Sequence, residues 1–145
     1  MFMYLHKNKK GFTLIELMVV VAIIGVLALL GLRLYTGQQA KAKEAIVKAN
    51  AGTVQTLIQS ELADGPVDIT SFKAGDPNGL VGANLHNPFT GVSMVDADFV
   101  EGVPGTATAT EGEIIINEIE SGIEFEVTGV GADDAPIPET LTAKR

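Results

Sequence analysis

Residues 11–32 read GFTLIELMVVVAIIGVLALLGL, and this stretch decides how the rest of the chain is arranged. From Phe12 to Leu32 the only charged side chain is that of Glu16. At ~1.5 Å per residue, a helix over these residues is about 30 Å long, which matches the hydrocarbon thickness of a bilayer. The stretch therefore predicts a helix that spans a membrane.

The charged residues divide the chain into a basic start and an acidic body. Three lysines stand immediately before the apolar stretch, which is typical of the cytoplasmic end of a membrane span (Lys7, Lys9 and Lys10). Residues 61–145 carry 16 acidic residues against three basic ones. We therefore expect this body on the far side of the membrane. We also expect it to bind no nucleic acid directly, since such binding needs clustered lysine and arginine.

Glu16 distinguishes this segment from a hydrophobic segment that is removed after secretion. The plainer interpretation is a cleaved secretory signal peptide, with small residues around Val26, Leu27 and Ala28 as its cleavage site. A carboxylate inside the apolar run costs about 2–3 kcal/mol on insertion scales and would not help such a peptide. We therefore expect a functional Glu16 with a cationic partner that reaches the apolar layer. The alternative is a carboxylate that snorkels to the surface from the helix start.

The run that begins Gly11-Phe12-Thr13-Leu14-Ile15-Glu16 and continues to residue 28 closely resembles the leader junction and helix start of type IV pilins and their pseudopilin relatives. The resemblance covers roughly residues 7–35. It implies that a prepilin peptidase cleaves after Gly11, methylates the new amino terminus at Phe12 and leaves 134 of the 145 residues.

The same resemblance implies the partner of Glu16, which is the α-ammonium that cleavage creates on Phe12 of a neighbouring subunit. Either charge alone is costly in an apolar layer, whereas the pair attracts, so pairing rewards correct axial register. We accordingly assign assembly and register to Phe12, Thr13 and Glu16.

One position departs from the family pattern. Arg33 stands where many members have proline, and arginine can continue a helix. Glycines at positions 25, 31 and 37 each weaken a helix by up to ~1 kcal/mol relative to alanine. Gly25 and Gly31 are therefore the expected positions of helix flexibility.

The helix is predicted to continue over residues 12–64, with its membrane-spanning part at residues 12–32. Beyond it, apolar residues recur at steps of three and four and form one stripe with Leu57 beside it (Val47, Ala51, Val54, Ile58 and Leu62). Gly65 and Pro66 follow its end. The stripe predicts that this amphipathic half packs on the body's own sheet.

Residues 65–145 hold all six prolines and are predicted to form a loop-rich body with a small antiparallel sheet. The domains are thus a leader (1–11), the helix (12–64) and this body, and the fold class is α+β. The predicted strands, of three or four in the sheet, are residues 92–100, 113–119 and 123–128, with Ser121-Gly122 as a hairpin turn.

Other parts of the body give weaker signals. Residues 106–110 are either a strand or a loop, and residues 132–145 are a tail of uncertain order. Residues 65–91 are predicted to be a long loop with turns at 76–79 and 87–91. The chain has no cysteine, so a disulfide cannot hold the loops of this body. They must be held by hydrogen bonds, turns, a metal ion or neighbouring subunits.

Nothing in the sequence supports an enzyme. Neither His6 nor His86 stands in a metal-binding or triad spacing, and cysteine is absent. Calcium has two weak candidate sites, for which a solvated acidic face is the preferred interpretation (Asp96, Asp98 and Glu101; Asp133 and Asp134). We therefore expect no resident cofactor.

The leading hypothesis is the major subunit of a type IV pilus, a homopolymer. By the resemblance, an assembly platform and a cytoplasmic ATPase add the inner-membrane subunit to a filament outside the cell. A second hypothesis is the major pseudopilin of a type II secretion or DNA-uptake system. A third is a secreted or membrane-tethered acidic binding domain that does not polymerise. Only the third predicts that Glu16→Ala changes no assembly.

Overall fold

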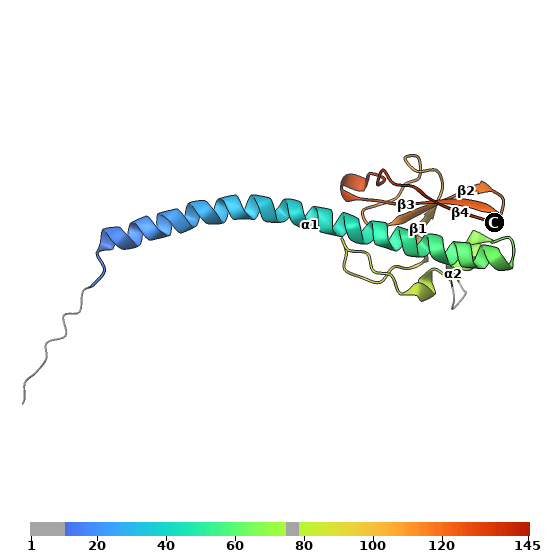
Figure 1. Cartoon of the computed structure of the whole chain (residues 1–145), viewed down its shortest axis with the longest axis horizontal. Helices are drawn as coiled ribbons and strands as arrows, with labels where there is room; N and C mark the ends of the chain where they lie inside the picture. The colour runs from blue at the N-terminus through green and yellow to red at the C-terminus, as the bar shows by residue number, and fades with distance from the viewer. Residues whose placement is uncertain (1–10, 75–78) are drawn as a thin grey trace, which may run out of the picture. The chain divides into compact units, whose positions relative to one another are not determined.

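The structure is a computed structural model that describes residues 11–74 and 79–145 (Figure 1). The rest of the predicted leader and most of the predicted turn at residues 76–79 lie outside the described residues. The chain divides into two compact units, Met1–Gln38 and Gln39–Arg145, and we call the second unit the head.

Helix α1 (Leu14–Asp64) confirms the long predicted helix. Its N-terminal part is long and apolar enough to cross a membrane by length and composition, with a mean hydropathy of 2.8 over the best 18-residue window. None of that window is buried. The helix ends where Gly65 and Pro66 follow it, as predicted from the sequence.

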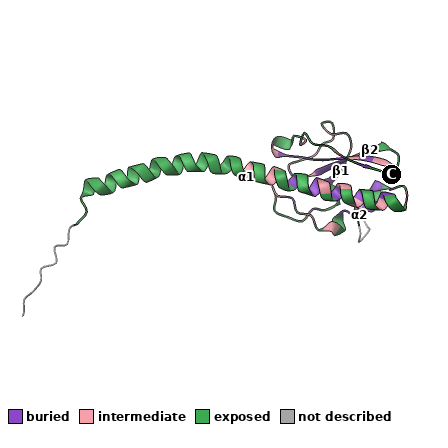
Figure 2. Cartoon of the chain, in the orientation of Figure 1, coloured by how far each residue is buried: buried purple, intermediate pink, exposed green. Residues whose placement is uncertain are grey.

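Within the head, the predicted apolar stripe is the buried face of α1 (Figure 2). Val47, Val54, Ile58 and Leu62 have no exposed surface. They pack in one core with the inward-facing residues of the sheet and with apolar residues of the intervening segment (Phe99, Ile114, Ile116, Phe125, Val127, Ala143; Val67, Ile69, Phe72, Leu80, Met94). This confirms that the second half of the helix packs on the sheet.

The sheet has four strands in the order β1 (Phe99–Glu101), β2 (Ile114–Glu120), β3 (Glu124–Gly129) and β4 (Leu141–Lys144). The prediction of a purely antiparallel sheet is wrong, because β1 pairs with β2 in parallel. Residues 102–113 connect them, and this is about the length that a parallel crossover needs. The turn at Ser121-Gly122 joins β2 and β3 as an antiparallel hairpin, as predicted.

The segment before the sheet is more regular than predicted. Residues 65–91 contain the helix α2 (Ile69–Ala74) and the 3-10 helix η1 (Val81–Ala83) rather than one long loop. The predicted strand at residues 92–100 is wrong for most of its length. The Asp98 carboxylate accepts a hydrogen bond from the Val95 backbone N–H (2.6 Å) and closes the 3-10 helix η2 (Asp96–Asp98).

The last residues are also ordered by pairing. The region predicted as an uncertain tail contains the 3-10 helix η3 (Ala132–Asp134) and then β4, whose partner strand is β3. Residues 106–110, which the sequence left open, contain no strand. The C-terminus is thus an edge of the sheet.

Candidate functional site

Helix α1 begins with reciprocal hydrogen bonds between Thr13 and Glu16. The Thr13 backbone N–H (2.9 Å) and the Thr13 hydroxyl (2.7 Å) both donate to Glu16 Oε2. In return, the Glu16 N–H donates to Thr13 Oγ1 at 3.3 Å. This is a capping box, which satisfies N–H groups that a helix start leaves without partners. It also holds the carboxylate at the positive end of the helix dipole.

The surroundings of this capping box are apolar and open. Phe12 is 90% exposed, and every residue from 11 to 39 is exposed. The Glu16 side chain shares a shallow groove with Phe12, Ile15, Val19 and Val20. Within the described chain, Thr13 binds Oε2 alone and leaves Glu16 Oε1 available to an incoming cation.

Gly25 and Gly31 lie inside α1, which is continuous in this subunit. No atom beyond the adjacent backbone lies within 4 Å of where a Cβ would stand at either glycine. Arg33 continues the helix, and its carbonyl oxygen accepts a hydrogen bond from the Thr36 hydroxyl (3.1 Å). Flexibility at the two glycines stays a prediction for the assembled state.

The first candidate calcium cluster is organised around a lysine. Lys73 Nζ lies 2.9 Å from Glu101 Oε1 and 4.0 Å from Asp96 Oδ1. Asp98 instead binds the Val95 N–H. The lysine thus occupies the position in which a cation would have to approach Asp96 and Glu101 together.

The second candidate pair stabilises a loop. Asp134 Oδ1 accepts a hydrogen bond from the Glu111 N–H (2.9 Å), and Glu111 Oε1 accepts one from the Asp133 N–H (3.0 Å). His86 lies elsewhere, with its ring nitrogens 3.1 Å from the Asn84 carbonyl oxygen and 3.2 Å from Ser93 Oγ. Across residues 11–74 and 79–145, no group of three or more histidine, aspartate or glutamate side chains is placed so that it could hold a metal ion.

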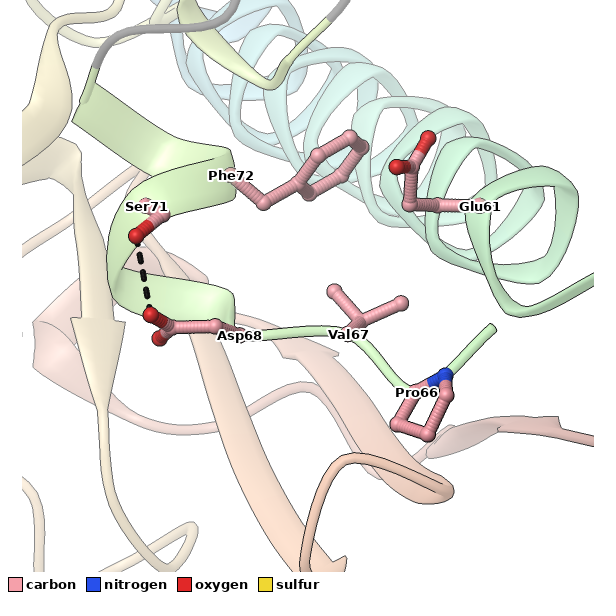
Figure 3. A pocket seen from close by; sticks show the side chains of 6 residues that line it. All are labelled: Glu61, Pro66, Val67, Asp68, Ser71 and Phe72. Carbon is pink, nitrogen blue, oxygen red and sulfur yellow. Dashed lines mark hydrogen bonds between the residues drawn. The ribbon is translucent and has the colours of Figure 1, made fainter. Parts of the chain in front are cut away.

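A hollow in the head lies between the end of α1 and the start of α2 (Figure 3). Phe72 and Val67 line it together with Glu61, and Asp68 and Ser71 face each other at its side. Asp68 Oδ2 accepts a hydrogen bond from the Ser71 hydroxyl (2.8 Å), and Oδ1 accepts one from the Thr70 N–H (3.2 Å). Asp68 therefore caps the first turn of α2.

These bonds make the contribution of Asp68 to stability dependent on pH. The Ser71 hydroxyl, aided by the Thr70 and Ser71 N–H groups, holds the pKa of Asp68 below its ordinary value. A lowered folded-state pKa means that the stabilisation is present above the unfolded value of about 3.9 and is lost as pH falls through the folded value. We expect Asp68→Ala to lower the unfolding free energy at pH 7 and the difference from wild type to narrow as pH falls below about 4, because the protonated carboxyl group binds these donors more weakly. Urea unfolding between pH 7 and pH 2 measures it, with Ser71→Ala as the companion variant, and a difference that is as large at pH 2 as at pH 7 would contradict it.

The sequence contains a signal for the helix start that the insertion-cost argument for Glu16 did not use. Thr13-Leu14-Ile15-Glu16 has the S/T-x-x-E pattern of a capping box directly before an apolar run. This pattern gives Thr13 a defined role as the intrachain partner of Glu16. By contrast, the placement of Lys73 between Asp96 and Glu101 depends on contacts distant in sequence.

Comparisons with known proteins identify a matching motif and several relatives. Residues 6–32 match the family model described as the prokaryotic N-terminal methylation motif. A type IV major fimbrial protein FimA of Dichelobacter nodosus is 34% identical over 142 residues, which cover 94% of this chain and 82% of that protein. Another FimA of the same organism is 32% identical over 115 residues, or 72% of each chain.

A type IV major alpha-pilin of Moraxella bovis is 30% identical over 110 residues, which cover 72% of this chain and 69% of the relative. No solved structure matches the chain. The similarity to FimA extends over nearly the whole chain and so includes the head as well as the apolar helix. The chain therefore belongs to the type IV pilin family and is a structural subunit rather than an enzyme.

Proposed function

We propose that this protein is the major subunit of a type IV pilus, cleaved between Gly11 and Phe12, methylated at Phe12 and polymerised through α1. The observation that carries the proposal is the exposed apolar N-terminal part of α1, whose start has a single carboxylate held by Thr13. The major fimbrial and alpha-pilin relatives support a pilus over a pseudopilus.

An exposed helix of this kind needs an apolar environment. Fully burying one large apolar side chain is worth about 1.5–3 kcal/mol, and this segment exposes more than a dozen of them. Two environments meet the need, a bilayer before assembly and a bundle of identical helices after it. The subunit thus exchanges one apolar environment for another, and the exchange itself favours neither strongly.

The charge at the start of α1 supplies the register that apolar packing lacks. In the unassembled subunit the Thr13 bonds stabilise the Glu16 carboxylate locally. On assembly, Glu16 Oε1 accepts a hydrogen bond from the Phe12 ammonium of a neighbouring subunit, while Thr13 continues to bind Glu16 Oε2. A neighbour displaced along the axis leaves both charges unpaired in an apolar layer, which costs several kcal/mol.

The proposal includes the machinery that such a subunit requires. A prepilin peptidase removes the leader, and an assembly platform with its ATPase extracts the subunit from the inner membrane. The assembled protein lies in a filament on the cell surface. Calcium has no proposed role, since Lys73 lies against the acidic residues of the first candidate site.

Intact-mass and N-terminal peptide analysis of two fractions of the native cell tests the proposal. We expect abundant chain beginning at methylated Phe12 in sheared surface filaments. The same processed chain confined to washed membranes would favour a pseudopilin. A chain that begins at Met1, or one cut near Ala28, would contradict the processing step.

Two substitutions at Glu16 separate its charge from its capping role. Glu16→Ala removes both, whereas Glu16→Gln keeps a capping box, because glutamine serves at this position as well as glutamate. We expect both variants to lower surface filaments about 100-fold or more while processed subunit remains in the membrane, since loss of one partner of a buried pair costs about 3–5 kcal/mol. Quantitative immunoblots of sheared and membrane fractions measure this.

Thr13→Ser is the matched control, since serine keeps the cap, and it should assemble normally. If Glu16→Gln assembles as wild type does, the carboxylate serves only as a cap and the register role is wrong. If wild type forms no filament and Glu16→Ala changes no assembly, the protein is a secreted or membrane-tethered domain that does not polymerise.

A further inference from the structure

The C-terminal strand β4 lies at an edge of the sheet, and helix α1 covers the side of β4 that faces away from β3. On the β3 side, Ala143 lies opposite Phe125, and the Arg145 N–H donates to the Ile123 carbonyl oxygen (3.1 Å). The other side of an edge strand has N–H and C=O groups with no strand to bind them. Here three of those groups, the Thr142 and Lys144 carbonyl oxygens and the Lys144 N–H, have partners on α1.

Two glutamines one helical turn apart supply these partners. Gln55 Nε2 donates to the Thr142 carbonyl oxygen at 2.7 Å. Gln59 binds Lys144 in both directions: its Nε2 donates to the Lys144 carbonyl oxygen (2.7 Å), and its Oε1 accepts from the Lys144 backbone N–H (3.0 Å). The side-chain amide of Gln59 thus does what the peptide group of a further strand would do.

The spacing works because a helix and a strand match over this length. The four steps from Gln55 to Gln59 advance ~6 Å along the helix, and the two steps from Thr142 to Lys144 advance ~6.6 Å along the strand. The match extends toward the N-terminus, where Lys48 forms an ion pair with Glu139. The eleven steps from residue 48 to residue 59 advance about 16.5 Å along the helix, which is the distance that five extended steps from residue 139 to residue 144 cover.

The residues between these contacts fit the same arrangement. Gly52 lies on this side of α1 next to Leu141, whose Cδ1 lies 4.0 Å from where a Cβ of residue 52 would stand. Ala143 has no exposed surface and belongs to the core, next to Phe125 in the sheet. Release of β4 would therefore expose core residues as well as a strand edge.

We propose that Gln55 and Gln59 form a latch that locks the C-terminal strand onto α1. The chain has no cysteine, so no disulfide can hold its last residues. The latch takes this role with three hydrogen bonds, and it can open and close without redox chemistry. This inference does not depend on how, or whether, the subunit polymerises.

The test uses the full chain in detergent micelles and hydrogen–deuterium exchange read by mass spectrometry. In the double variant Gln55→Leu/Gln59→Leu, we expect exchange in peptides covering residues 141–145 to rise about 10- to 100-fold. Each of the three hydrogen bonds that this variant removes stabilises the closed state modestly, and their loss together accounts for a rise of this size. Peptides covering Ile114–Glu120 should exchange as in wild type. Thr56→Ala/Ser60→Ala is the matched control, because those hydroxyls bind carbonyl oxygens of α1 itself.

A second variant keeps the test decisive if the double variant fails to fold. Gln55→Glu has the same shape but cannot donate to the Thr142 carbonyl oxygen while it is ionised, whereas its protonated form can. Relative to wild type at each pH, residues 141–145 of this variant should exchange faster at pH 7 and equally at pH 3. The proposal is overturned if residues 141–145 exchange at the wild-type rate in the leucine variant, if the control opens as far, or if Gln55→Glu shows no dependence on pH.

Discussion

Replacing Gly112 with alanine is expected to destabilise the head by about 3–5 kcal/mol, the sum of backbone strain and a lost buried hydrogen-bond network. Gly112 is buried, and its φ of +88° lies in a region that residues with a side chain rarely adopt. A Cβ at this position would also lie well inside 3.0 Å of the Asn87 side-chain amide, so that Asn87 would have to move.

Asn87 cannot move without breaking bonds. This side chain is only 3% exposed. Its Nδ2 donates to the Glu111 carbonyl oxygen (2.9 Å), and its Oδ1 accepts from the Phe89 (2.8 Å) and Thr90 (3.3 Å) backbone N–H groups. Asn87 thereby connects the turn at residues 87–91 to the segment just before β2. Displacement leaves the buried Asn87 amide without partners, which costs about 1–3 kcal/mol for each unpaired group.

Two further variants separate these causes. Gly105 has a similar φ of +86°, but no atom lies within 4 Å of its Cβ position, so Gly105→Ala reports the backbone strain alone. Asn87→Ala reports the loss of the network alone. We expect urea unfolding to rank Gly112→Ala as less stable than either. Equal losses for Gly112→Ala and Gly105→Ala would show that Asn87 yields without cost.

The parts of the fold that could be predicted from the sequence are those that depend on local pattern. The buried face of α1 follows from the spacing of Val47, Val54 and Ile58, because residues three and four apart share one side of a helix. The β2–β3 hairpin follows from the alternation of polar and apolar residues on both sides of Ser121-Gly122. Both features are settled within about twenty residues of chain.

The parts that could not be predicted depend on pairing between distant segments. β4 has four residues, and its pairing with β3 and its bonds to Gln55 and Gln59 join residues far apart in sequence. The parallel pairing of β1 with β2 is decided by the path of residues 102–113, which carry no signal for direction. For the same reason the candidate calcium cluster did not reveal Lys73, which lies 28 residues before Glu101.

The helix start was easier to predict than the head, for a physical reason. The roles proposed for Gly11, Phe12 and Glu16 all concern one short stretch of chain, where the sequence order is the spatial order. The Thr13 capping box has the same local character. What the sequence of one subunit does not contain is the axial offset between subunits, and so the pairing of Glu16 with a neighbouring Phe12 remains a proposal.

Replacing Gly129 with alanine is expected to destabilise the head by about 1–3 kcal/mol through overpacking, the second large effect. Gly129 lies at the end of β3, opposite Ile114 of β2. A Cβ there would lie well inside 3.0 Å of Val47 Cγ1 and 3.4 Å from the Val47 carbonyl oxygen. Val47 has no exposed surface and belongs to the core. The methyl group would therefore push α1 away from the sheet.

A double-mutant cycle with Val47→Ala tests this contact. Val47→Ala alone should destabilise the head by leaving a cavity, but it removes the atom that the new methyl group meets. We therefore expect the double variant Val47→Ala/Gly129→Ala to be at least 0.5 kcal/mol more stable than the sum of the two single losses. Gly131→Ala is the matched control, since the nearest atom lies 3.5 Å from its Cβ position, and it should change stability little. If the losses simply add, the cost of Gly129→Ala does not come from Val47, and the close approach of α1 to β3 does not explain why a glycine stands there.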